Sequence, residues 1–221
     1  MASMSILIIL SLCYGFVGVV LIALYAGYNE VQNTSFLTSI FSSRQHRIYF
    51  ILLFICSFVL LMWQDISATY VILCFLLLLG IIDIKCLALP DMLNFSLLFI
   101  CAVYAFLEST LTGESFIYRV LLGFGVGGVF FALKIFYQSL SSRDIIGEAD
   151  IIVLSSLGIA FGAFSAFVSV FLGSVVALVY ALFLHFFLKH NLFGLKLPFC
   201  FFIFVGTMLH FLWLSYGDRY A

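Results

Sequence analysis

Residues 68–83 read ATYVILCFLLLLGIID, an apolar run that ends on the aspartate Asp83. About 20 consecutive apolar residues in a helix span the hydrocarbon core of a bilayer, and this run approaches that length. A second aspartate, Asp150, opens the apolar run DIIVLSSLGIAFGAF (150–164). An ionisable side chain at membrane depth is energetically costly and usually has a functional reason. The two aspartates are therefore the first candidate functional residues.

The composition indicates that lipid is the solvent for most of the chain. Of its 221 residues, 66% are hydrophobic and only 9% are charged, and the mean hydropathy is +1.30. Soluble domains carry about 25% charged residues. One water-soluble core could not bury this much apolar surface, so the sequence predicts an all-α polytopic membrane protein with a single membrane domain over 1–221.

The apolar runs predict about eight transmembrane helices. The expected spans are 4–27, 48–63, 68–84, 91–108, 117–137, 149–163, 165–188 and 198–216. The long run 149–188 is divided between Gly162 and Ser165, where small residues gather.

Basic residues set the expected orientation, because cytoplasmic loops are enriched in Lys and Arg. With loop 28–47 in the cytoplasm, seven of the nine basic residues fall on that side: Arg44, Arg47, Lys85, Lys134, Arg143, Lys189 and Lys196. Arg119 and Arg219 then lie outside, as do both termini. Asp83 and Asp150 are both expected at the cytoplasmic ends of their helices.

Several other chemistries lack their sequence signatures. A net charge of −1 argues against a nucleic-acid partner. The six cysteines form no C-x-x-C pair and the four histidines form no H-E-x-x-H, so no metal site and no cofactor are predicted. No G-x-S-x-G serine motif occurs. Carboxylate chemistry is left: two carboxylates about 3 Å apart share a proton, so that one activates water and the other polarises a carbonyl.

Two features have ordinary structural explanations. Asp91 follows Pro90 at the start of an apolar run, where an aspartate is expected to cap the helix and favour its dipole. The chain also contains two G-x-x-x-G patterns, formed by Gly123 with Gly127 and by Gly158 with Gly162. They predict close contacts between helix backbones.

Three segments carry a family resemblance. IDIKCLALPDMLN (82–94) resembles the D-x-K/R-x-x-x-x-P-D/N-x-L segment of type IV prepilin peptidases, which are bacterial aspartyl proteases of the GxGD class. GEADIIVLSSLG (147–158) resembles their G-x-G-D motif, and LKLPFCFFIFVGTMLHFL (195–212) resembles a third, C-terminal segment. The order and spacing are similar to those of the family.

The resemblance implies roles for individual residues. Asp83 and Asp150 match the two catalytic aspartates, and Gly147 matches the first glycine of the GxGD motif. Residues expected to shape the site or bind substrate are Lys85, Pro90, Asp91, Gly147 and Glu148. Two positions depart from the family pattern. Ala149 replaces the second glycine, and Ile152 replaces the usual lysine.

The implied function is that of a hydrolase of the bacterial inner membrane. It would cut the short basic leader from type IV prepilins or pseudopilins at the cytoplasmic face, serving a type IV pilus or type II secretion. Because loop 28–47 is short and cysteine-free, the N-methyltransferase activity of larger members is expected to be absent. Two alternatives stay open: a small proton-coupled transporter, and an inactive scaffold of a pilus or secretion assembly. The sequence does not determine the oligomeric state.

Overall fold

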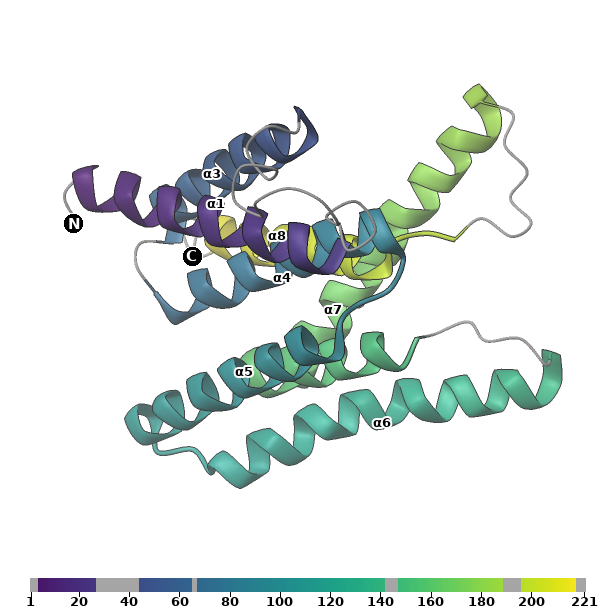
Figure 1. The fold of residues 1–221 in the computed structure, drawn as a ribbon. Helices are drawn as coiled ribbons and strands as arrows, with labels where there is room; N and C mark the ends of the chain where they lie inside the picture. The colour runs from purple at the N-terminus through teal and green to yellow at the C-terminus, as the bar shows by residue number, and fades with distance from the viewer. Residues whose placement is uncertain (1–3, 27–43, 65–66, 142–146, 189–195, 218–221) are drawn as a thin grey trace. The chain divides into compact units, whose positions relative to one another are not determined.

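A computed structural model describes residues 4–26, 44–64, 67–141, 147–188 and 196–217. Every regular element in these ranges is an α-helix (Figure 1). The helices are α1 (Met4–Ala26), α3 (Arg44–Gln64), α4 (Ala68–Cys86), α5 (Asp91–Thr112), α6 (Phe116–Ser141), α7 (Glu148–Leu188) and α8 (Phe199–Gly217). Of these, six are long and apolar enough to cross a membrane, and α8 is apolar but shorter. The all-α prediction is confirmed, and the helices indicate a multi-pass membrane protein.

The helix bounds follow the predicted spans within a few residues. The helix α3 begins at Arg44 rather than at 48, so the described end of the expected 28–47 loop is helical; the loop up to residue 43 lies outside the described residues. The helix α7 covers both spans predicted in 149–188, and its backbone is broken at Gly162, inside the predicted break between Gly162 and Ser165. The count of eight spans and the outward termini stay predictions.

The chain forms two compact units, which divide after Cys86. In the first unit, α1 packs against α3 and α4. The Tyr14 hydroxyl donates a hydrogen bond to the Cys74 carbonyl across 2.7 Å. A Cβ at Gly18 would lie 2.6 Å from Cδ1 of Leu53, so the glycine permits the close approach of α1 and α3.

In the same unit, α3 and α4 run antiparallel. Near one end the hydroxyls of Ser57 and Tyr70 share a hydrogen bond of 2.7 Å. Near the other end, Nζ of Lys85 lies 5.9 Å from the ring centroid of Tyr49. Asp83 therefore lies in the last turn of α4, at the end of this unit where α3 begins.

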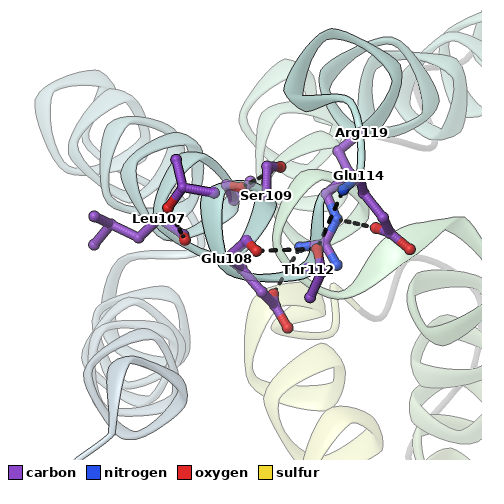
Figure 2. A network of polar contacts seen from close by, with 8 residues as sticks. Leu107, Glu108, Ser109, Thr112, Glu114 and Arg119 are labelled. Atoms are coloured by element: carbon purple, nitrogen blue, oxygen red, sulfur yellow. Dashed lines mark hydrogen bonds and ion pairs between the residues drawn. The ribbon is translucent and has the colours of Figure 1, made fainter.

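The second unit starts at Leu87 and begins with the α5–α6 hairpin. Gly113 closes α5 with a left-handed backbone (φ 76°), which glycine adopts without a steric penalty. Figure 2 shows the Arg119 side chain of α6 between two glutamates. Its Nη1 lies 2.6 Å from Glu108 and its Nε lies 2.8 Å from Glu114. These ion pairs connect the two helices at the turn of the hairpin.

Small residues set the crossing of α6 and α7. A Cβ at Gly158 would lie 2.9 Å from Cα of Gly123, and a Cβ at Gly127 would collide with the Ser155 hydroxyl. The helices therefore touch backbone to backbone along an antiparallel register. Close packing is confirmed for these three glycines, as the G-x-x-x-G pattern predicted.

Gly162 has a different role from its predicted one. It interrupts α7 with φ 83° and ψ 161°, values reserved almost entirely for glycine. Among the described residues, no atom lies within 4 Å of a Cβ built there. The packing predicted for Gly162 is wrong, whereas the break predicted at this residue is confirmed, and the ribbon of α7 changes direction along its length (Figure 1).

The part of α7 beyond the break packs against α8. A Cβ at Gly173 would lie 2.5 Å from the Phe202 carbonyl oxygen, and a Cβ at Gly206 would collide with the Ser169 carbonyl. In the second unit, α5, α6 and the part of α7 before Gly162 therefore pack together. The part of α7 after Gly162 forms a close pair with α8.

Candidate active site

Asp150 occupies the first turn of α7 and folds back onto the residue that begins the helix. Gly147 precedes the helix, and its carbonyl accepts the first helical hydrogen bond, from the Ile151 N–H across 3.4 Å. The Gly147 N–H in turn donates to Oδ2 of Asp150 across 3.2 Å. In a capping box, an acidic or amide side chain at the third helical residue accepts a hydrogen bond from the N–H of the N-cap residue. Asp150 and Gly147 form this half of the motif. The positive end of the helix dipole also stabilises a carboxylate there.

The geometry gives a physical reason for glycine at 147. A Cβ on this residue would lie 3.0 Å from Oδ2 of Asp150, closer than an ordinary contact. Glycine thus lets the Asp150 carboxylate fold back without displacement. Asp150 itself is partly exposed.

Ala149 does not disturb this turn. It lies inside α7. Among the described residues that are not glycine, only Leu87 has a positive φ. No unusual backbone conformation is therefore required at 149, and alanine is a good helix former there. Ile152 also lies in the helix and carries no charge, so it does not supply the positive charge that the usual lysine would bring to this turn.

Among the described residues, Lys134 of α6 supplies a positive charge to this turn. Its Nζ lies 3.5 Å from Oε1 of Glu148, in the same helical turn as Asp150. The Lys134 side chain is only 10% exposed, whereas the Glu148 side chain is 87% exposed. The sequence offered one clue, a lysine within an apolar span, but the pairing depends on the register of α6 against α7.

The start of α5 lies at the same end of the second unit as Asp150. The helices α5, α6 and α7 alternate in direction, and α5 packs against α7. The rings of Tyr104 and Phe161 lie 6.1 Å apart, and each is 13 residues beyond the first residue of its helix. The starts of α5 and α7 are therefore level. We call this the Asp150 end, formed by the starts of α5 and α7 and the last turns of α6.

Two predicted site residues lie in this first part of α5. Pro90 is the N-cap, with φ −68° and ψ 130°, and no side-chain hydrogen bond caps the helix. The capping predicted for Asp91 is therefore wrong, although its carboxylate does lie in the first turn, near the positive end of the dipole. Asp91 is exposed, so its charge faces the surroundings at the Asp150 end.

Asp83 and Lys85 belong to the first unit. Asp83 is 6% exposed and is the one acidic side chain in the buried class among the described residues. The helix that carries it, α4, is the most deeply buried of the six long apolar helices. Because Asp83 and Asp150 belong to different units, the pairing of their carboxylates stays a prediction. Asp144, the other acid close to this motif, lies outside the described residues.

In the described part of the chain, no three His, Cys, Asp or Glu side chains are grouped as a metal ion would require.

Comparison with known proteins identified a family. The model of the type IV leader peptidase family matches residues 70–182, slightly more than half of the chain. The matched stretch contains both aspartates and the segments around Pro90 and Gly147. The third segment, 195–212, lies outside it, so that part of the resemblance stays a prediction. No curated protein and no solved structure matched the chain.

Proposed function

The chain belongs to the type IV leader peptidase family, and we propose that it removes the short basic leader from type IV prepilins or pseudopilins. The family implies aspartic-type peptidase activity and prepilin-type substrates in general. The observation that carries the finer proposal is the capped first turn of α7. There Gly147 holds the side chain of Asp150, and Asp150 and Asp83, the two aspartates proposed to be catalytic, both lie in the matched stretch.

The proposed reaction is hydrolysis of one peptide bond by Asp83 and Asp150. One carboxylate accepts a proton from a water molecule while the water oxygen attacks the scissile carbonyl carbon. The other carboxyl group is protonated and donates a hydrogen bond to the carbonyl oxygen. The tetrahedral intermediate then collapses, and a proton passes to the leaving nitrogen. The products are a leader with a free carboxylate and a mature chain with a free amine. No metal and no cofactor take part in this scheme.

The acidic side chains at the Asp150 end suit a basic leader. Glu148 and Asp91 are exposed there, and neither is buried in the packing between helices. We assign them to attraction of the leader, whose positive charges would gather at this end. The apolar helix of the substrate would lie in lipid beside the enzyme, which brings the scissile bond toward the membrane interface.

We assign the enzyme to the bacterial inner membrane, with both aspartates at the cytoplasmic face, as the distribution of Lys and Arg favours. Lys134 and Asp150 lie at one end of the second unit, and Arg119 lies at the α5–α6 turn. The charge count likewise assigns Lys134 and Asp150 to the cytoplasmic side of the membrane and Arg119 to the outer side. We propose a peptidase without N-methyltransferase activity.

An inactive scaffold was the alternative that rested on Ala149 and Ile152. The helical backbone at Ala149 removes the steric half of that argument, and the proposal therefore keeps an active dyad. A proton-coupled transporter would need no cleavage of a leader, so the experiment below distinguishes it.

The test is co-expression of the protein with a prepilin, followed by an immunoblot for the leader. The substitutions Asp83→Asn and Asp150→Asn keep side-chain shape, and an asparagine at 150 can still accept a hydrogen bond from Gly147. Each should abolish cleavage while the protein stays in the membrane at normal amounts. Cleavage at the normal rate by either variant would refute the dyad.

A matched control changes a carboxylate at the other end of the α5–α6 hairpin. Glu114 is exposed and pairs with Arg119, so Glu114→Gln should leave cleavage intact. Mass spectrometry of the mature product tests the scope of the enzyme. A methylated N-terminus made by this chain alone would contradict the peptidase-only proposal.

A further inference from the structure

Asn94 is a fully buried amide at the start of α5. Its exposed fraction is 0%. Among the described residues, neither Oδ1 nor Nδ2 has a hydrogen-bond partner. An unsatisfied buried polar group costs about 1–3 kcal/mol, and each instance in a native structure calls for an explanation.

Buried hydroxyl side chains in these helices are satisfied locally, whereas the ring nitrogens of His210 in α8, like the Asn94 amide, lack a hydrogen-bond partner among the described residues. Ser109, Ser155, Ser156 and Thr207 each donate to the carbonyl four residues earlier, over 2.6–2.9 Å. Such bonds are the usual arrangement for hydroxyl side chains in helices. The Asn94 amide therefore differs from the buried hydroxyl groups of these helices, each of which has a partner.

Asn94 lies at the height of Asp150 along the two parallel helices α5 and α7. It lies ten residues before Tyr104 in α5, and Ile151 lies ten residues before Phe161 in α7. Because those two rings are 6.1 Å apart and the helices run in the same direction, each earlier residue is about 15 Å back along its helix. Asn94 is thus level with the turn of α7 that carries Asp150.

A side-chain amide has the hydrogen-bonding groups of a peptide bond: its NH₂ donates and its carbonyl accepts. A backbone peptide group of an extended segment, with one C=O and one N–H, satisfies both. From the burial, the missing partners and the position level with Asp150, we infer that Asn94 binds the substrate backbone beside the scissile bond. This inference rests on the proposed peptidase function. The ligand is the peptide group itself, so it does not depend on the side chains of the leader.

The experiment measures binding separately from cleavage. The probe is a synthetic prepilin peptide with a lysine-rich leader, a glycine at the cleavage point and the apolar segment that follows. Its affinity is measured for full-length Asp150→Asn protein in detergent, with and without Asn94→Leu. Loss of one or two hydrogen bonds to the substrate should weaken binding about tenfold. In the active protein, Asn94→Leu should lower kcat/KM for the same peptide by about tenfold to a hundredfold.

The stability of the substrate-free protein supplies the contrasting readout. Leucine replaces an unsatisfied amide by an apolar side chain of similar size, so the unfolding temperature should stay equal or rise. A bound structural water would give the opposite pattern, with a lower unfolding temperature and unchanged peptide affinity. That pattern would overturn the inference, as would unchanged affinity at any stability. Asn94→Ala serves as the second variant, since it removes the amide without adding volume.

The matched control is Ser96→Ala on the same helix. The Ser96 hydroxyl is exposed and already donates to the Met92 carbonyl across 2.7 Å, so its loss should leave affinity and kcat/KM unchanged. Cleavage of the peptide by the wild-type protein tests the proposed function, whereas Asn94-dependent binding tests this inference. The two can therefore fail separately.

Discussion

The Gly147 N–H donates to Oδ2 of Asp150 across 3.2 Å, so the residue before α7 holds the side chain of the third residue within it. This contact leaves no room for a Cβ, which would lie 3.0 Å from the same oxygen. The neighbour that must move is the end of a side chain rather than backbone. A substitution at 147 should therefore affect the carboxylate more than the fold.

We expect Gly147→Ala to lower the rate of prepilin cleavage at least tenfold, because the Asp150 carboxylate must leave its hydrogen-bonded position. The loss in unfolding free energy should stay near 1 kcal/mol, since alanine is only a poorer N-cap. Initial rates and thermal unfolding of the purified protein measure the two effects. Gly125→Ala is the control, because among the described residues no atom lies within 4 Å of a Cβ there. Equal rates for wild type and Gly147→Ala would contradict the role of this contact.

The charges at the Asp150 end should govern the KM for a basic leader. Glu148→Gln and Asp91→Asn should each raise KM by about twofold to fivefold at low salt, with smaller effects at high salt. Lys134→Met removes the cation 3.5 Å from Glu148 and should shift KM in the opposite direction. Peptides with lysine-rich and uncharged leaders, compared at two ionic strengths, measure this. A salt-independent KM would argue against electrostatic attraction, and Glu114→Gln should behave as wild type.

The α6–α7 crossing should be sensitive to one methyl group. A Cβ at Gly123 would lie 2.5 Å from the backbone nitrogen of Ile159, so Gly123→Ala must push the two helices apart. We expect a loss of about 1–3 kcal/mol in unfolding free energy. Thermal unfolding or protease resistance in detergent measures it. Gly125→Ala, two residues along the same helix, has open space and should be neutral or stabilising by up to about 1 kcal/mol.

Gly162 should be sensitive for a different reason. Its surroundings are open within the described residues, but its φ of 83° and ψ of 161° are strained for any residue with a Cβ. Gly162→Ala should therefore cost about 1–3 kcal/mol, without any steric clash. Gly128→Ala, where space is also open and the residue lies within α6, is the comparison. If both alanine variants unfold at the same temperature, the break in α7 is not required by the fold.

The sequence by itself determined the all-helical membrane class, because the length and apolarity of each run are local properties that specify a helix in lipid. Local signals also placed the break at Gly162 and identified the segments around Asp83 and Asp150. Sequence spacing, however, grouped Gly162 with Gly158 as a packing pair. In the structure Gly123, Gly127 and Gly158 pack closely, and Gly162 does not.

The tertiary structure decided which side chains meet, because contacts between helices depend on register and on which helices are neighbours. The pairing of Lys134 with Glu148 follows from the antiparallel fit of α6 on α7. Asn94 lies at the same height as Asp150 because α5, α6 and α7 alternate in direction. The lack of hydrogen-bond partners for its amide becomes significant only once its burial is known. No spacing within one helix contains this information, since each helix presents several faces and the packing selects one of them.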